Sequence, residues 1–125
     1  MKPGVLIFGG SPAGLQAALD LAKARIEVLL AEISPFIGDT PLFKHPEYIS
    51  NTQALEAAKH PCIHLLTHTE LESAEKRRNT FKVQLHMRPR YVDLSRCTGC
   101  GDCLEVCPVQ VPGNEHKAIY LGDGH

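Results

Sequence analysis

The chain has 125 residues, of which 43% are hydrophobic and 22% charged, and its formal net charge is -1. This composition is typical of a globular protein of about one domain, and it excludes an intrinsically disordered chain and a strongly basic nucleic-acid-binding surface. No apolar run approaches the roughly 20 residues that cross a bilayer, and the short apolar run near the start ends at a glycine pair, so we expect neither a membrane span nor an export signal.

The first part of the chain predicts a strand, a helix and a second strand. The apolar run Val5–Phe8 lies between glycines, as in a strand buried on both faces of a parallel sheet. Pro12 is tolerated in the first turn of a helix, and apolar residues then recur at helical spacing as far as about Arg25. Residues 27–31 predict the next strand, which is followed by Glu32. This order is that of a βαβ unit with parallel strands.

A loop and a short helix are expected next. Three prolines and Gly38 indicate a loop over residues 33–49. Ser50 and Gln53 have the spacing of a capping box, which predicts a helix over about residues 52–59.

The following segment predicts a strand and a β-hairpin. Residues 63–67 are mostly apolar and predict a third strand. Residues 81–88 alternate between apolar and polar side chains, which is typical of a strand with one exposed face. Residues 77–79 would turn the chain into that strand from a weaker partner strand at residues 71–74. The basic run at residues 76–78 is interpreted as a solvated turn.

The last part of the chain holds four of the five cysteines. It follows Pro89 and begins with a short strand predicted at residues 91–93. The cysteines are Cys97, Cys100, Cys103 and Cys107, in the spacing C-x2-C-x2-C-x3-C-P. Zinc sites normally use two C-x2-C pairs a dozen or more residues apart, and the second pair is missing. Cysteines at three-residue steps with Gly99 and Gly101 between them are typical of the bacterial ferredoxin loop that binds a [4Fe-4S] cluster; zinc and an unloaded loop are the alternatives.

The identity of the fourth cluster ligand stays open at this point. In ferredoxins with two clusters, the fourth cysteine of such a run binds the other cluster, but this sequence contains no second run. Either Cys107 folds back onto the same cluster, or Cys62 or a partner chain supplies the thiolate, or the cluster keeps three protein ligands. We favour Cys107, because Cys62 at the head of a strand is interpreted as a small buried hydrophobe. An odd number of clustered cysteines does not suit a disulfide framework, so we expect a cytoplasmic protein.

The turn after the first strand has the outline of a dinucleotide-binding fingerprint. In G-x-G-x-x-G the first glycine makes the tight turn, the second lets the pyrophosphate approach, and the third packs the helix against the strand. Gly9 and Gly14 occupy the first and third positions, and Ser11 replaces the middle glycine. Glu32 follows the second strand, where an acid holds the ribose hydroxyls. We therefore predict a nucleotide site at Gly9, Gly10, Ser11, Gly14 and Glu32, with a packed but empty βαβ unit as the alternative.

Taken together, these segments resemble the A subunit of heterodisulfide reductase, an FAD and iron-sulfur protein. The likeness is carried by GGSPAGLQAALDLA, EVLLAE, IGD, HPCIHLLTHTELE, NTFKVQLHMRPRYVD, CTGCGDCLEVCPVQVP and KAIYL, which cover nearly the whole chain. The resemblance implies a thioredoxin-reductase-like flavoprotein with a ferredoxin module inserted into its FAD domain. It also implies that Gly9, Gly10, Gly14 and Glu32 belong to the FAD-binding turn and its ribose acid, and that the four clustered cysteines are cluster ligands.

The chain departs from this family pattern in three respects. Ser11 and Asp39 stand where the family has glycines. The segment between Gly38 and His60 is shorter than in the family. A second ferredoxin run and the rest of the FAD domain, expected after KAIYL, are missing from the sequence. The resemblance is therefore to a truncated form of the family.

We predict an α/β protein with two modules. Residues 1–88 would form a partial Rossmann-like, FAD-binding βαβ unit with an added β-hairpin, and residues 89–125 a small ferredoxin-like module with a [4Fe-4S] cluster. The predicted function is electron transfer as part of a larger oxidoreductase whose other subunits supply the rest of the electron path, with no nucleic-acid or membrane partner and no catalytic residue of its own. A non-catalytic docking or assembly protein, or a gene fragment, is the alternative. A nicotinamide-dependent dehydrogenase is disfavoured because no substrate domain follows the glycine turn.

Overall fold

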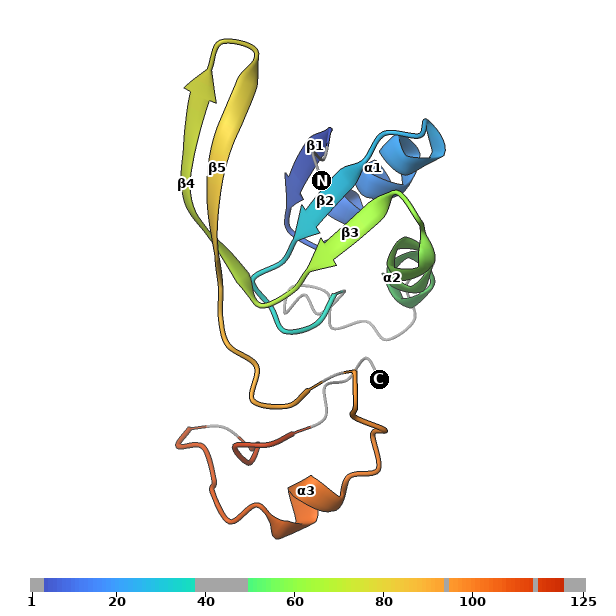
Figure 1. The fold of residues 1–125 in the computed structure, drawn as a ribbon. Helices are drawn as coiled ribbons and strands as arrows, with labels where there is room; N and C mark the ends of the chain where they lie inside the picture. Colours follow the sequence, from blue (N-terminus) through green and yellow to red (C-terminus); the bar gives the residue numbers. More distant parts are fainter. Residues whose placement is uncertain (1–3, 38–49, 94, 114, 121–125) are drawn as a thin grey trace. The chain divides into compact units, whose positions relative to one another are not determined.

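A computed structural model describes residues 4–37, 50–93, 95–113 and 115–120 of the chain (Figure 1). Apart from the last two residues, the chain divides into two compact units, Met1–Pro89 and Arg90–Asp123, which we name unit 1 and unit 2. None of the described helices has the length and apolar composition that a membrane span requires. Most of the predicted proline-rich loop, including Asp39, lies outside the described residues.

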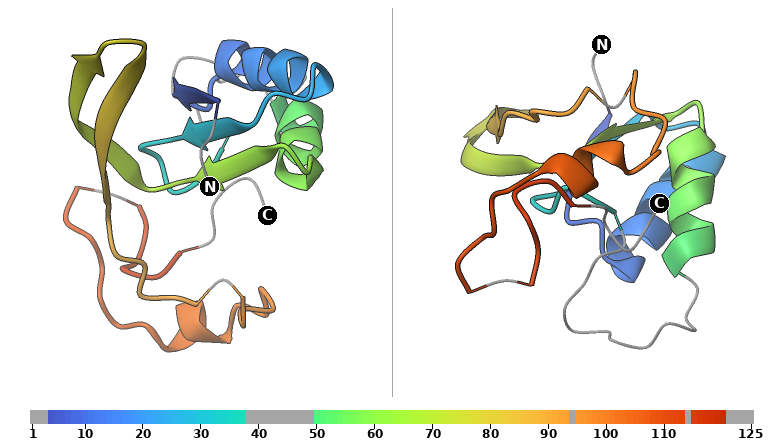
Figure 2. Two further views of the ribbon diagram at one scale, coloured as in Figure 1. Left: turned by 45° about the horizontal axis from the view of Figure 1, so that its top comes forward. Right: turned by 90° about the horizontal axis from the view of Figure 1, so that it is seen from below.

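Unit 1 is built on a three-stranded parallel sheet. Strands β1 (Val5–Phe8), β2 (Val28–Ala31) and β3 (Ile63–Leu66) lie side by side in the order β1-β2-β3 and pair along their whole lengths. Helix α1 (Pro12–Lys23) connects β1 to β2, and α2 (Ser50–Lys59) precedes β3. Both helices cover the same face of the sheet (Figure 2). The parallel sheet predicted from the βαβ pattern is thus confirmed.

The core of unit 1 lies between the two helices and this face of the sheet. Its buried members are Leu15, Ala18, Leu19, Ala22, Val28, Leu30, Ala57 and Ile63. The four from α1 recur at helical spacing, which gives this helix a single buried side. Val28 and Leu30 are alternate residues of β2 that face the same core, and each such buried side chain contributes about 1.5–3 kcal/mol. Cys62 packs against the core from the turn before β3.

A long β-hairpin follows β3. Strands β4 (Thr69–Arg77) and β5 (Thr80–Met87) are antiparallel and are joined by a two-residue turn at Arg78 and Asn79, within the turn that the sequence predicts. The φ of Arg78 is 43°, in the left-handed region that two-residue hairpin turns use. The pairing shifts between Leu71 and Ser73, so the residue between them is a bulge.

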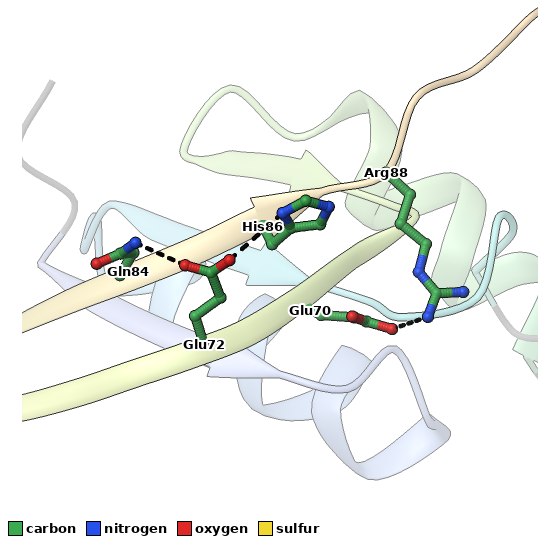
Figure 3. Close-up of polar contacts among 5 residues, drawn as sticks. All are labelled: Glu70, Glu72, Gln84, His86 and Arg88. Carbon is green, nitrogen blue, oxygen red and sulfur yellow. Dashed lines mark hydrogen bonds and ion pairs between the residues drawn. The ribbon is translucent and has the colours of Figure 1, made fainter.

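One face of the hairpin carries paired polar side chains (Figure 3). Glu72, at the bulge, accepts a hydrogen bond from the Nε2 of Gln84 at 2.6 Å and lies 3.4 Å from the Nδ1 of His86. Glu70 forms an ion pair with Arg88. Because these side chains are about one third to one half exposed, each ion pair contributes at most about 1 kcal/mol. The strand predicted from the alternation is confirmed as β5, but its apolar face is only half-buried at Val83 and Leu85, and Phe81 and Met87 are exposed.

The described part of unit 2 contains little regular structure. Its helix α3 (Asp102–Val106) lies within the cysteine run, and a single bridge pairs Gln110 with Lys117. Cys107 is the one buried residue among those that the structure describes in this unit. Apolar burial therefore contributes little to the stability of unit 2.

The strand predicted at residues 91–93 is wrong. Residues 91 and 92 form bends, and Asp93 begins a turn. The Asp93 carboxylate accepts hydrogen bonds from the hydroxyl and the backbone N–H of Ser95 at 2.6 and 2.9 Å, and these two bonds lower its pKa. The Asp93 carbonyl accepts the N–H of Cys97 at 2.9 Å. Local bonds of this kind compete with strand pairing, and here they lead the chain into the first cysteine.

Candidate functional site

The turn after β1 requires glycine at the first and third fingerprint positions. Gly9 has a φ of 116°, which residues with a side chain rarely adopt. A Cβ on Gly14 would lie 2.0 Å from the carbonyl oxygen of Gly9, a distance that no side chain tolerates. The first glycine is thus needed for its backbone conformation, and the third for the close contact between helix and turn.

Ser11, at the middle position, caps α1. Its backbone is extended, a conformation open to any residue, and its Oγ accepts the N–H of Gly14 at 3.3 Å. Pro12 follows in the first turn, where a missing N–H costs nothing. The first N–H groups of a helix are the donors that bind phosphate in dinucleotide sites. Ser11 therefore occupies one of these donors, the N–H of Gly14.

The Glu32 side chain connects the segments that follow β1 and β2 through hydrogen bonds. Its carboxylate accepts hydrogen bonds from the backbone N–H of Gly10 and, at 2.8 Å, from that of Ser34. A Cβ on Gly10 would lie 3.0 Å from the Glu32 carboxylate, so glycine at this position lets the acid come close. The residues gathered at the carboxyl ends of β1 and β2 are Gly9, Gly10, Ser11, Gly14 and Glu32. Open α/β sheets bind their ligands at this edge.

His68 lies at the same edge and is a residue that the fingerprint does not mark. Its φ of 57° is left-handed, and its N–H donates to the carbonyl of Ser34 at 2.9 Å. The Nδ1 of His68 is buried without a hydrogen-bond partner among the described residues. Residues other than glycine adopt this conformation uncommonly, and those that do are found more often near functional sites. In the sequence His68 lies four residues after His64, but in a predicted strand and turn rather than a helix, so this spacing predicts surface or core residues and not a pair of ligands.

The four clustered cysteines surround α3 in unit 2. Cys97 and Cys100 precede the helix, Cys103 lies within it and Cys107 follows it. The first three are exposed and Cys107 is buried. All four are free thiols, as is Cys62.

Two left-handed glycines shape the loop between the cysteines. Gly99 and Gly101 have φ values of 71° and 86°, a region that costs other residues roughly 1–2 kcal/mol. A Cβ on Gly99 would meet no atom within 4 Å. Glycine is therefore needed here for its left-handed backbone and not to avoid a steric clash. Gly101 is also the N-cap residue of α3. These glycines let the chain change direction between successive cysteines.

Cys107 is the buried member of the four, and the backbone around it favours its thiolate form. Its Sγ lies 4.0 Å from the carbonyl oxygen of Val109. Hydrogen bonding to the backbone of Val109, and next to that of Ile119, lowers the pKa of the Cys107 thiol. A lowered pKa favours the thiolate, which is the form that binds iron. Cys62, in contrast, packs against the hydrophobic core of unit 1.

The four clustered thiols have the kind and number of ligands that a [4Fe-4S] cluster takes. In the part of the chain that the structure describes, no three His, Cys, Asp or Glu side chains are close enough together to hold a metal ion. In a [4Fe-4S] cluster each thiolate binds a different iron atom, whereas the four sulfurs of a zinc site all bind one ion.

The sequence of unit 2 matches a known iron-sulfur family. Residues 91–112 match the family described as a 4Fe-4S binding domain. This segment contains all four clustered cysteines and both left-handed glycines of the loop. The chain therefore carries a 4Fe-4S binding domain, as its cysteine spacing predicts.

Similarity to heterodisulfide reductases extends along nearly the whole chain. The chain is 38% identical, over 94% of its length, to one of the iron-sulfur A subunits of CoB–CoM heterodisulfide reductase from Methanopyrus kandleri. It is 38% identical over 93% of its length to the corresponding iron-sulfur protein of Methanocaldococcus jannaschii, and 39% identical over 94% to a protein of Archaeoglobus profundus that is itself described as similar to these A subunits. The chain spans only about a fifth of the length of these relatives, 19–20%.

A solved structure shares part of the fold. An oxidoreductase from Agrobacterium tumefaciens aligns with 68% of this chain and 32% of its own, with a TM-score of 0.52 and 30% sequence identity. The fold is thus a mixed α/β fold with a parallel sheet and a 4Fe-4S binding domain. The resemblance found in the sequence is confirmed: the chain is homologous to a segment of the heterodisulfide reductase A subunit that includes a 4Fe-4S binding domain.

Proposed function

We propose that this protein transfers single electrons through one [4Fe-4S] cluster held by its four clustered cysteines, with Cys107 as the fourth ligand. The observation that carries the proposal is the set of four free thiols in one loop, inside the segment that matches a 4Fe-4S binding domain. When bound, the cluster supplies a one-electron redox couple. The chain's own residues hold it, set its exposure and connect it to partners.

The loop determines how the cluster is held and how it is reached. The three exposed cysteines, Cys97, Cys100 and Cys103, would leave one side of the cluster close to solvent and to a docking electron carrier. The buried Cys107 would attach the cluster to the segment that follows α3. Because unit 2 has almost no apolar core among its described residues, cluster binding would contribute much of its folding energy.

Electron transfer in a single turnover tests this function. The protein is loaded with iron and sulfide without oxygen, reduced, separated from the reductant and mixed with an oxidised viologen or cytochrome. We expect the acceptor to gain about one electron per chain while the visible absorption of the cluster recovers. A loaded cluster that passes no electron to any acceptor would contradict the proposal and favour an assembly role.

We further propose that the protein works as part of a larger reductase in the cytoplasm. The relatives in M. kandleri and M. jannaschii are named as subunits of heterodisulfide reductase, and their chains are about five times as long as the matched segment. A partner chain would then supply the remaining steps of the electron path. Five free thiols suit a reducing compartment.

For unit 1 we propose a Rossmann-like half-site for FAD that another polypeptide segment completes. Support comes from the parallel β1-α1-β2 arrangement, from Gly9 and Gly14 at the positions that need glycine, and from Glu32 at the end of β2. Glu32 would accept hydrogen bonds from the ribose hydroxyls in place of one of its two backbone hydrogen bonds, from Gly10 or Ser34. The first turn of α1 would face the pyrophosphate.

Replacing Ser11 is expected to strengthen FAD binding. In Ser11→Gly the N–H of Gly14 becomes free for the pyrophosphate and the side chain no longer occupies the approach, so we expect about 10-fold tighter binding, or ~1.4 kcal/mol. Ser11→Ala separates the two causes, because it frees the N–H but keeps a Cβ. Fluorescence titration with FAD, and competition with ADP, measures both variants. Equal affinity of all three proteins for FAD would contradict the role of Ser11.

A further inference from the structure

Lys117 lies outside the cysteine run, but its side chain reaches back to it. The Nζ of Lys117 donates to the carbonyl of Leu104 at 2.7 Å and lies 3.5 Å from the carbonyl of Glu105. Both carbonyls belong to α3, and the last carbonyls of a helix have no partner within it. A lysine ammonium suits this position because it offers several donors and a charge opposite to that of the helix end.

The backbone after Cys107 places Lys117 at this position. A bridge pairs Lys117 with Gln110, and the N–H of Ala118 donates to the carbonyl of Val109 at 2.8 Å. The segment that follows Cys107 thus folds back along itself and returns Lys117 to the helix. As a result, α3, Cys107 and the returning segment form one hydrogen-bonded loop that the Lys117 side chain closes.

Lys117 also brings a positive charge to the cluster loop. Its ammonium contacts the carbonyls of Leu104 and Glu105, which lie between Cys103 and Cys107. A nearby positive charge favours the extra electron of a reduced cluster, because that electron adds negative charge. Net charge near the cluster is one of the factors that set its potential.

We propose that Lys117 is a positioning residue for the cluster loop, which holds the end of α3 between Cys103 and Cys107 and raises the reduction potential of the cluster by its charge. The inference rests on the proposed function, because it concerns the same cluster. The cysteine spacing does not mark Lys117, which lies beyond the segment that matches the 4Fe-4S binding domain.

Three substitutions separate the hydrogen bonds of Lys117 from its charge. Lys117→Arg keeps both, Lys117→Gln keeps a donor without charge, and Lys117→Met removes both. Lys82, an exposed lysine on β5 of unit 1, provides the matched control Lys82→Gln. Each full-length protein is loaded anaerobically, and two quantities are measured: the rate of iron loss to a chelator and the midpoint potential in a dye-mediated titration.

We expect the rate of iron loss to rise about 10-fold in Lys117→Met and less in Lys117→Gln, since removing residues that orient metal ligands has effects of this order. The midpoint potential is expected to fall in both uncharged variants and to stay near the wild-type value in Lys117→Arg and Lys82→Gln. A merely structural lysine would change the rate of iron loss but leave the potential of Lys117→Gln unchanged.

Two results would overturn the inference. One is a wild-type potential in both uncharged variants, and the other is a wild-type rate of iron loss in Lys117→Met. If Lys117→Met fails to fold, the comparison of Lys117→Gln with Lys117→Arg decides both points. Wild-type protein that takes up no cluster refutes the proposed function and this inference together, whereas a loaded wild type with unaffected variants refutes the role of Lys117 alone.

Discussion

Gly14→Ala is expected to destabilise unit 1 by about 3 kcal/mol. The added Cβ would lie 2.0 Å from the carbonyl oxygen of Gly9, so either the helix or the turn has to move. Helix propensity alone gives the opposite sign, because alanine is favoured over glycine within a helix by about 1 kcal/mol. The sign of the measured change in the free energy of unfolding, from urea titration, therefore tests the close contact directly.

Ala17→Gly is the matched control for this substitution. Ala17 is an exposed residue of the same helix, so its replacement changes helix propensity without touching the turn. We expect a loss of about 1 kcal/mol. If Gly14→Ala were neutral or stabilising while Ala17→Gly behaved as expected, the tight packing of α1 on the glycine turn would be refuted, and with it the main structural support for a nucleotide site.

Cys100→Ser is expected to abolish stable cluster binding. A serine hydroxyl does not supply the thiolate that iron in such clusters prefers, and the neighbouring positions offer no replacement sulfur. Iron and sulfide content should fall well below the wild-type level, and unit 2 should lose most of its protection from proteolysis, because its described residues form almost no apolar core. Metal analysis and limited proteolysis of the anaerobic protein measure both effects.

The comparison of Cys107→Ser with Cys62→Ser identifies the fourth ligand. We expect Cys107→Ser to lose the cluster as Cys100→Ser does. Cys62→Ser should keep wild-type iron and sulfide, with a loss of about 1 kcal/mol in stability for a hydroxyl at the edge of the core. Loss of the cluster in Cys62→Ser, with retention in Cys107→Ser, would reverse this assignment.

The sequence predicts the core elements of unit 1 because their patterns are local. The apolar spacing from Leu15 to Ala22 is enough to define α1 and its buried side. The end of α1 is less predictable: the helix stops at Lys23, and Arg25 adopts a φ of 61°. Arginine has no special preference for a left-handed backbone, so the end of the helix cannot be predicted from the residue at this position.

Strand β4 shows what pairing adds to local preference. Its charged residues predict only a short, weak strand, yet it extends from Thr69 to Arg77. Pairing with β5 imposes this length, and it continues past the bulge next to Leu71 with the register shifted by one residue. The turn at residues 78–79 can be predicted, since its position follows from the alternation of β5.

In the candidate cluster site, the cysteine ligands can be predicted from the sequence, but the residues that position them cannot. The spacing from Cys97 to Cys107 indicates the chemistry without any structure. The strand predicted at residues 91–93 is wrong because the hydrogen bonds of Asp93 favour a turn over the β preference of the residues before it. The role of Lys117 cannot be predicted from spacing, because its contact with Leu104 depends on how the intervening chain folds back.

Analysis of iron, zinc and acid-labile sulfide in protein prepared without oxygen tests most directly whether one loop of thiols holds an iron-sulfur cube. Visible spectra of the same sample before and after reduction accompany it. We expect about four iron and four sulfide per chain, and a broad absorption that weakens on reduction. Protein that contains zinc without sulfide, or that refuses both iron and sulfide on reconstitution, would contradict the assignment of these cysteines to a [4Fe-4S] cluster.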